Sequence, residues 1–246
     1  MHIQNTQAIS QPWLHIFLYG DTGAGKTTAA ATMPSPLMLV PANEGSELTL
    51  AGQDIPFIKL GRDANDQHMD VCTHTNMVLS ELEDRMARFN AGDDDAFPWE
   101  TIVLESWTHY CDMVIASLTN DGRKPMDMQG WGKLATFLMQ VHSRLRRLPV
   151  HVVFTALAKL SEGEGKAQVG MPSIPGSVAL KLPTSCDIIG YMEEIPPSRG
   201  GDVSTHRVHF RKKGPYMART RFRGFPPHID DFSFDQIAPL CGLSVG

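Results

Sequence analysis

Short runs of apolar residues recur along the chain and predict the strands of a buried sheet. They lie at residues 14–19, 36–40, 57–60, 101–106, 150–155 and 187–192. Runs of this length, bounded by Gly, Pro or polar residues, are typical of strands that are covered on both faces. We therefore expect these segments to form the centre of the protein.

Between most of these runs, apolar residues recur every three or four positions, which is the spacing of one helix face. Residues 78–89, 110–118 and 134–148 show this spacing, and residues 27–33 begin a further helix that ends before Pro34. Strands that alternate with helices predict an α/β fold with a mainly parallel central sheet flanked by helices.

The later part of the chain departs from this alternation. Residues 159–176 contain several Gly and Pro residues without periodicity, so we predict a long loop there. Residues 206–210 and 216–222 predict a C-terminal antiparallel hairpin around Gly214-Pro215. We expect a single domain over residues 1–246, with a core at about 13–223 and a short C-terminal tail, 224–246.

Composition narrows the class of protein. The chain of 246 residues has 22 Lys and Arg against 27 Asp and Glu, which argues against a globally basic nucleic-acid binder but not against a local basic patch. The first residues show no signal-peptide pattern, and no apolar run approaches the roughly 20 residues of a membrane span. None of the four cysteines forms a C-x-x-C pair, so we expect a reduced, cytoplasmic protein. His68, Cys72 and His74 lack the further ligands that a zinc site needs.

One motif dominates the candidate chemistry. Residues 20–27 fit the phosphate-loop pattern G-x-x-x-x-G-K-[ST], placed between a predicted strand and a predicted helix. Glycines let backbone N–H groups converge on phosphate, and the helix start adds a positive dipole end. The residues expected to bind ATP are Gly20, Asp21, Thr22, Gly23, Ala24, Gly25, Lys26, Thr27 and Thr28.

ATP hydrolysis needs more than a phosphate loop. Lys26 is expected to reach the β- and γ-phosphates, and the Thr27 hydroxyl is expected to bind Mg²⁺. Glu105 ends an apolar strand, where an acid that supports the metal belongs. Glu44 follows the strand after the phosphate-loop helix and is the candidate base that activates water.

The order of these segments resembles the RecA-type ATPase core, and more narrowly the small phage nucleotide-binding proteins that act in single-strand annealing or recombination. The resemblance rests on residues 20–28, 39–45, 102–106 and 152–156, and it spans about 14–222. It implies that Glu44 activates water and that Glu105-Ser106 is the acid-serine pair of the later strand. Two positions depart from the pattern: Glu105 stands where Asp is usual, and Leu157 stands where a Gln senses the γ-phosphate.

The resemblance also implies single-stranded DNA as a partner, a ring or filament of identical subunits with active sites at their interfaces, and a single-strand-binding protein as a further partner. It places a DNA-contacting loop at residues 159–176. Arg123, Lys124, Lys159 and Lys166 are the candidate DNA contacts. RecA proteins carry trans-acting lysines on a late strand, so Arg211, Lys212 and Lys213 are candidates to reach a neighbour's γ-phosphate. A bacterial host cell is the expected location if a phage encodes the chain.

Two other functions fit a phosphate loop. A helicase-loader type of ATPase usually shows an Asp-Glu pair at the strand end and an Asn on the sensor strand, where this chain has Glu105-Ser106 and Thr155. A small-molecule kinase needs an arginine-rich lid. The sequence shows no compact arginine-rich lid, although Arg144, Arg146 and Arg147 lie on a predicted helix.

Overall fold

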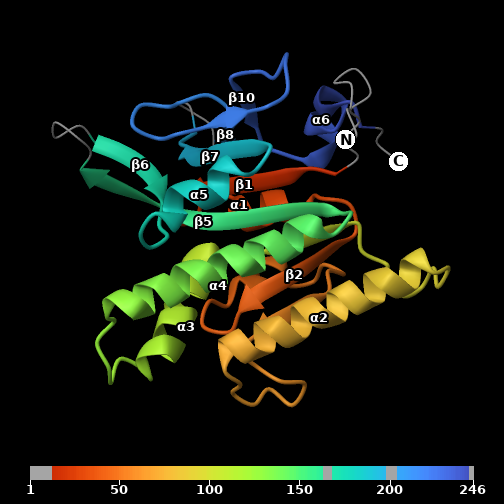
Figure 1. Ribbon diagram of the computed structural model, residues 1–246. Helices are drawn as coiled ribbons and strands as arrows, with labels where there is room; N and C mark the ends of the chain where they lie inside the picture. Colours follow the sequence, from red (N-terminus) through yellow and green to blue (C-terminus); the bar gives the residue numbers. More distant parts are fainter. Residues whose placement is uncertain (1–12, 163–167, 198–203, 244–246) are drawn as a thin grey trace, which may run out of the picture.

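The computed structural model describes residues 13–162, 168–197 and 204–243, which form one mixed sheet with helices on both faces (Figure 1). The strand order is β10-β8-β7-β1-β5-β4-β2-β3, while β6 pairs with β5 and β9 pairs with β7. The strands are β1 (His15–Gly20), β2 (Pro36–Pro41), β3 (Phe57–Leu60), β4 (Thr101–Leu104), β5 (His151–Glu162), β6 (Gln168–Pro172), β7 (Ile188–Ile195), β8 (Thr205–His209), β9 (Arg219–Thr220) and β10 (His228–Asp230).

Strand β1 lies at the centre of the sheet. It pairs in parallel with β5 on one side and with β7 on the other, so that Gly20 lies opposite both Leu157 and Met192. Strand β4 is parallel to both β5 and β2. The carboxyl ends of β1, β2, β4 and β5 therefore meet at one edge, which is where parallel α/β sheets place their ligands.

Helices cover both faces because alternate residues of each strand point to opposite sides. On one face, Phe17 and Tyr19 of β1 pack in a core with α2, α3, α4 and α5, and α2 and α4 are seen crossing the sheet in Figure 1. On the other face, Ile16 and Leu18 pack with α1, α6 and the 3₁₀ helix η2. The helices are α1 (Lys26–Ala31), η2 (Ser46–Leu50), α2 (Val71–Asn90), α3 (Trp107–Thr119), α4 (Met128–Arg147), α5 (Val178–Thr184), α6 (Phe234–Ile237) and η4 (Pro239–Cys241).

Residues 159–176 do not form the long loop that the sequence predicted. Strand β5 continues beyond the sheet to Glu162 and pairs antiparallel with β6, with Ala158 opposite Pro172. Residues 163–167 lie outside the described part. Gly170 is needed because a Cβ there would lie 2.2 Å from Tyr216 Cδ1. The glycine that suggested a loop instead allows a close aromatic contact within a hairpin.

The C-terminal strands pair differently from the prediction. Strand β8 pairs antiparallel with β7 and β10, and β9 pairs with β7, so segments 206–210 and 216–222 do not form a hairpin with each other. An isolated bridge joins Tyr216 to Lys213, which lies between the two segments. Val208 is fully buried opposite Met192, so pairing with β7 completes the core. The predicted α/β class, a mainly parallel central sheet flanked by helices, is confirmed, and the C-terminal strands are antiparallel although they do not form the predicted hairpin.

None of the helices in the part of the chain that the structure describes has both the length and the apolar character to cross a membrane.

Candidate functional site

The phosphate loop connects the carboxyl end of β1 to the start of α1. Gly23 and Gly25 both have φ of 83°, in the left-handed region that favours glycine, and Gly25 is the N-cap of α1. A Cβ on Gly20 would lie 2.2 Å from the Met192 carbonyl oxygen. The glycines of the motif are therefore required by the backbone path as well as by the approach of a phosphate.

Lys26 lies within this loop, with only 7% of its surface exposed. Its ammonium Nζ donates to the carbonyl oxygens of Gly20 at 3.1 Å and Asp21 at 2.8 Å. Burial lowers the pKa of Lys26, while the nearby carboxylates of Glu105 and Glu44 act in the opposite direction. The cation is thus held against the loop on which phosphates are expected to bind.

Thr27 and Glu105 are in direct contact, although 78 residues separate them. The Thr27 hydroxyl donates to Glu105 Oε1 at 3.1 Å. Glu105 follows β4 and is 2% exposed, and its second oxygen, Oε2, is buried without a hydrogen-bond partner in the structure. A hydroxyl beside a carboxylate oxygen in need of a partner suits Mg²⁺, which prefers oxygen ligands.

The electrostatics of Glu105 support the same assignment. Burial raises its pKa to about 7, and repulsion from Glu44 adds to the shift, while the Thr155 hydroxyl, Lys26 and Thr27 oppose it. A carboxylate in this environment lacks enough positive charge around it. A divalent cation between Thr27 and Glu105 would supply that charge, so the residues present fit Mg²⁺.

Glu44 lies after β2 and meets residues that follow β4. Its Oε2 accepts a hydrogen bond from the Ser106 backbone N–H at 2.8 Å, and its Oε1 accepts one from the Ser106 hydroxyl at 3.3 Å. His109 Nδ1 lies 3.0 Å from Glu44 Oε1. The two acids that the sequence placed in separate strands therefore stand at one edge, Glu105 beside Thr27 and Glu44 beside Ser106.

Two histidines of this site were missed by sequence reasoning. His109 contacts Glu44, and the ring of His206 covers the phosphate loop: its Nε2 is 3.1 Å from the Gly23 carbonyl oxygen. A Cβ on Gly25 would lie 2.8 Å from His206 Cγ. His206 is separated from Gly23 by 183 residues and belongs to no motif, so no local signal marks it.

Four of the basic residues between 207 and 223 lie away from the chain's own phosphate loop. Arg211 and Lys212 line an open cavity of about 480 Å³ together with Arg219 and Arg223. Arg219 pairs with Ile189, toward the amino end of β7, whereas the phosphate loop leaves the carboxyl end of β1. Lys213 differs from these four because its Nζ lies 3.4 Å from Oε1 of Glu193, which follows Met192, the residue of β7 opposite Gly20.

The candidate DNA contacts occupy separate segments. Arg123 and Lys124 are exposed in the turn between α3 and α4. Lys159 lies on the β5–β6 hairpin, and its Nζ donates to the Ile174 carbonyl oxygen at 2.9 Å, so this cation has a structural contact. Lys166 lies outside the described residues.

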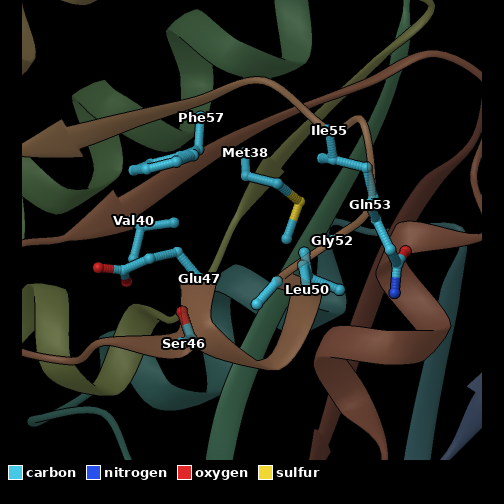
Figure 2. A pocket seen from close by; sticks show the side chains of 10 residues that line it. Met38, Val40, Ser46, Glu47, Leu50, Gly52, Gln53, Ile55 and Phe57 are labelled. Carbon is cyan, nitrogen blue, oxygen red and sulfur yellow. The ribbon is translucent and has the colours of Figure 1, made fainter.

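A small apolar cavity of about 220 Å³ lies between β2, β3 and η2, shortly after Glu44 in the chain (Figure 2). Met38, Leu50 and Ile55 contribute apolar side chains to it. Glu47 forms an ion pair with Lys59 at 2.7 Å, while Ser46 Oγ and Glu47 Oε2 are buried without partners in the structure. Leu50 also shares a core with Ala29 and Ala30, which places the cavity beside the phosphate-loop helix.

No group of three or more His, Cys, Asp or Glu side chains within residues 13–162, 168–197 and 204–243 is arranged to hold a metal ion. The Thr27–Glu105 pair is a different kind of site, because Mg²⁺ is usually bound by one or two protein ligands together with phosphates and water.

Residues 14–222 match the family described as AAA domain, and no curated protein matches the chain. Similar solved structures include an ATPase from the type III secretion system of pathogenic bacteria, at 13% identity and a TM-score of 0.47 over 73% of this chain and 51% of that chain. A KaiC-like protein from Pyrococcus horikoshii OT3 is similar at 14% identity and a TM-score of 0.43, over 81% and 78% of the two chains. The chain therefore spans about half the length of the secretion-system ATPase.

Proposed function

The chain belongs to the AAA domain family, and on this premise we propose that it binds Mg·ATP at residues 20–28 and hydrolyses it to ADP and phosphate. The observation that carries the proposal is the convergence of Lys26, Thr27, Glu105 and Glu44 at one sheet edge, where Thr27 contacts Glu105 at 3.1 Å. Both Lys26 and Glu44 lie near enough to influence the pKa of Glu105.

Each of these residues has one role in the proposed reaction. The loop N–H groups and Lys26 hold the phosphates, and Thr27 and Glu105 would hold Mg²⁺, which offsets the phosphate charge when bound. Glu44 takes a proton from water while the water oxygen bonds to the γ-phosphorus. The bond from that phosphorus to the bridging oxygen breaks, and ADP leaves with the electron pair.

We further propose that the protein acts on single-stranded DNA in phage-type annealing or recombination. Support comes from the resemblance to the RecA-type pattern and from the exposed cations Arg123 and Lys124. Lys166 and Lys159 are further DNA contacts in this proposal. The hydrogen bond from Lys159 to the Ile174 carbonyl oxygen competes with DNA binding. In this function, residues 1–246 form one domain that acts in the cytoplasm of a bacterial host, with a single-strand-binding protein as a further partner.

Assembly into a ring or filament is part of the proposal. Arg211 and Lys212 line a cavity without a carboxylate, and no hydrogen bond or ion pair is found for their side chains among the described residues. Cations without a carboxylate partner can bind a phosphate supplied by a neighbouring subunit. Lys213 would have to break its ion pair with Glu193 to bind that phosphate. A cation that crosses a subunit interface stabilises charge on the transferred phosphoryl group.

The test is ATP turnover by the purified chain with and without single-stranded DNA, together with electron micrographs of the same samples. We expect DNA to stimulate turnover, and we expect rings or filaments. Neutralising Arg123, Lys124, Lys159 and Lys166 should weaken DNA binding and flatten its salt dependence. Neutralising Arg85 and Arg88 on α2, which pair with Glu81 and Asp93, is the control for loss of surface cations elsewhere. The DNA-handling function would be contradicted if DNA did not change ATP turnover and if neutralising Arg123, Lys124, Lys159 and Lys166 did not change DNA binding.

A further inference from the structure

Three polar side chains meet where β2 and β4 end: Glu44, Ser106 and His109. His109 Nδ1 lies 3.0 Å from Ser106 Oγ and 3.0 Å from Glu44 Oε1. Ser106 contacts both oxygens of Glu44, through its backbone N–H at 2.8 Å and its hydroxyl at 3.3 Å. The cluster is sheltered: Ser106 is 1% exposed, and the side chains of Glu44 and His109 are 13% and 31% exposed.

The helix start that carries this cluster is unusual. Ser106 is the N-cap of α3, and His109 follows three positions later. A serine at this position normally accepts a hydrogen bond from a backbone N–H of the first turn. Ser106 makes no such cap bond, and its hydroxyl contacts Glu44 and His109 instead. The Ser106 hydroxyl therefore contacts the Glu44 carboxylate and His109 in place of a backbone N–H of α3.

The positions of the protons follow from the geometry. If the Ser106 hydroxyl donates to Glu44, its oxygen can accept a hydrogen bond from an N–H at His109 Nδ1. If Nδ1 carried no proton, its lone pair would lie 3.0 Å from the carboxylate oxygen Glu44 Oε1, which is repulsive. The network therefore favours the form of His109 with a proton on Nδ1, facing Glu44 and Ser106.

The same contacts limit what Glu44 can still bind. A carboxylate has about four acceptor positions. Ser106 and His109 surround Oε1, and the Ser106 N–H takes one position on Oε2. One acceptor position on Oε2 is left for a water molecule.

We propose that His109 is a positioning residue for ATP hydrolysis, which holds Glu44 and Ser106 so that one carboxylate oxygen faces the attacking water. This inference rests on the proposed function, because it assigns a purpose to Glu44. His109 touches neither phosphate nor metal in this proposal. Its loss should therefore lower kcat and leave the binding of Mg·ATP unchanged.

The experiment compares four variants of the full chain: His109→Ala, His109→Asn, His109→Gln and the control His68→Ala. His68 is an exposed histidine before α2, and its side chain forms no hydrogen bond or ion pair among the described residues. The amide nitrogen of Asn lies as many bonds from Cα as Nδ1 does, whereas that of Gln corresponds to Nε2. We expect His109→Ala and His109→Gln to lose about 10- to 100-fold in kcat, the effect of one hydrogen bond to a charged group. His109→Asn should recover much of the rate.

Binding of a fluorescent ATP analogue and thermal melting are measured alongside, and both should stay at wild-type values in all four variants. His109→Ala with wild-type kcat, while Glu44→Gln is inactive, would overturn the inference and leave the proposed function standing. Equal rates for His109→Asn and His109→Gln would also overturn it, because Nδ1 would not be the acting atom. Normal turnover by Glu44→Gln would instead overturn the assignment of Glu44 itself. If His109→Ala fails to fold, the comparison of Asn with Gln still decides.

Discussion

His142 is the clearest source of acid sensitivity in this protein. It lies on α4 with 2% of its surface exposed, stacks on Phe154 with ring centroids 5.0 Å apart, and has Nε2 3.0 Å from Ser185 Oγ. Its ring also lies beside Trp107, which begins α3 next to the Glu44 cluster. Burial lowers the pKa of His142 from 6.5 to about 3, and the charge of Arg146 adds to the shift.

The sign of the effect follows from proton binding. The pKa of His142 is lower in the folded state than in the unfolded state, so the unfolded chain binds the proton more tightly. The stability that depends on neutral His142 is present above pH 6.5 and is lost as the pH falls toward 3. The full shift corresponds to about 5 kcal/mol, of which about 2 kcal/mol falls between pH 7 and pH 5.

The assay is urea unfolding of wild type and His142→Gln at pH 5, 6 and 7, because Gln keeps a polar group near Ser185 but does not titrate in this range. We expect the wild type to lose about 2 kcal/mol more than the variant between pH 7 and pH 5. Other groups, such as His151, whose pKa burial lowers to about 4, contribute to both proteins and cancel in the difference. His68→Gln, at an exposed site, should behave as wild type. An equal pH dependence of wild type and His142→Gln would refute the reasoning.

Three further predictions concern the proposed reaction. Lys26→Ala should abolish ATP turnover, because it removes a charge-assisted contact to the phosphates; a steady-state ATPase assay that shows full activity would contradict the phosphate-loop assignment. Glu44→Gln should bind the fluorescent ATP analogue normally but not hydrolyse ATP, whereas Glu105→Gln should require more Mg²⁺; a magnesium titration of both distinguishes the roles, and the reverse pattern would exchange them. Protein with residues 211–213 neutralised should be inactive alone and regain turnover when mixed with Lys26→Ala protein, because a mixed interface pairs an intact loop with intact cations; no recovery in proven mixed assemblies would argue against action in trans.

The strands and the phosphate loop were predictable because their signals are local. Buried parallel strands require apolar side chains on both faces, so the runs at β1, β4 and β5 mark the centre of the sheet directly. The loop at residues 20–27 has its glycines, lysine and threonine in one continuous segment, and the structure finds Gly23 and Gly25 in the left-handed conformation that only glycine adopts readily.

The predicted loop at residues 159–176 and the predicted hairpin of segments 206–210 and 216–222 were both wrong. In each case the local sequence is compatible with more than one structure. Gly170 and the prolines around it suggest a loop, yet Gly170 lies in β6, where it makes room for Tyr216. Segments 206–210 and 216–222 have the spacing of a hairpin, but β7 offers a better partner for both. Which strand pairs with which depends on the buried surface that each pairing completes, and that surface exists only in the folded sheet.

The sequence alone thus determined the parallel strands, the phosphate loop and the acids that follow β2 and β4, because each is encoded by neighbouring residues or by strand position. Tertiary structure decided the contacts among them: Thr27 with Glu105, Glu44 with Ser106 and His109, and His206 on the loop. These contacts span between 62 and 183 residues, apart from the one between Ser106 and His109. Hydrogen bonds require atoms to meet within about 3 Å. The parallel order β1, β5, β4 and β2 brings the first of these atoms together, and β8, which pairs with β7 beside β1, brings His206 to the loop.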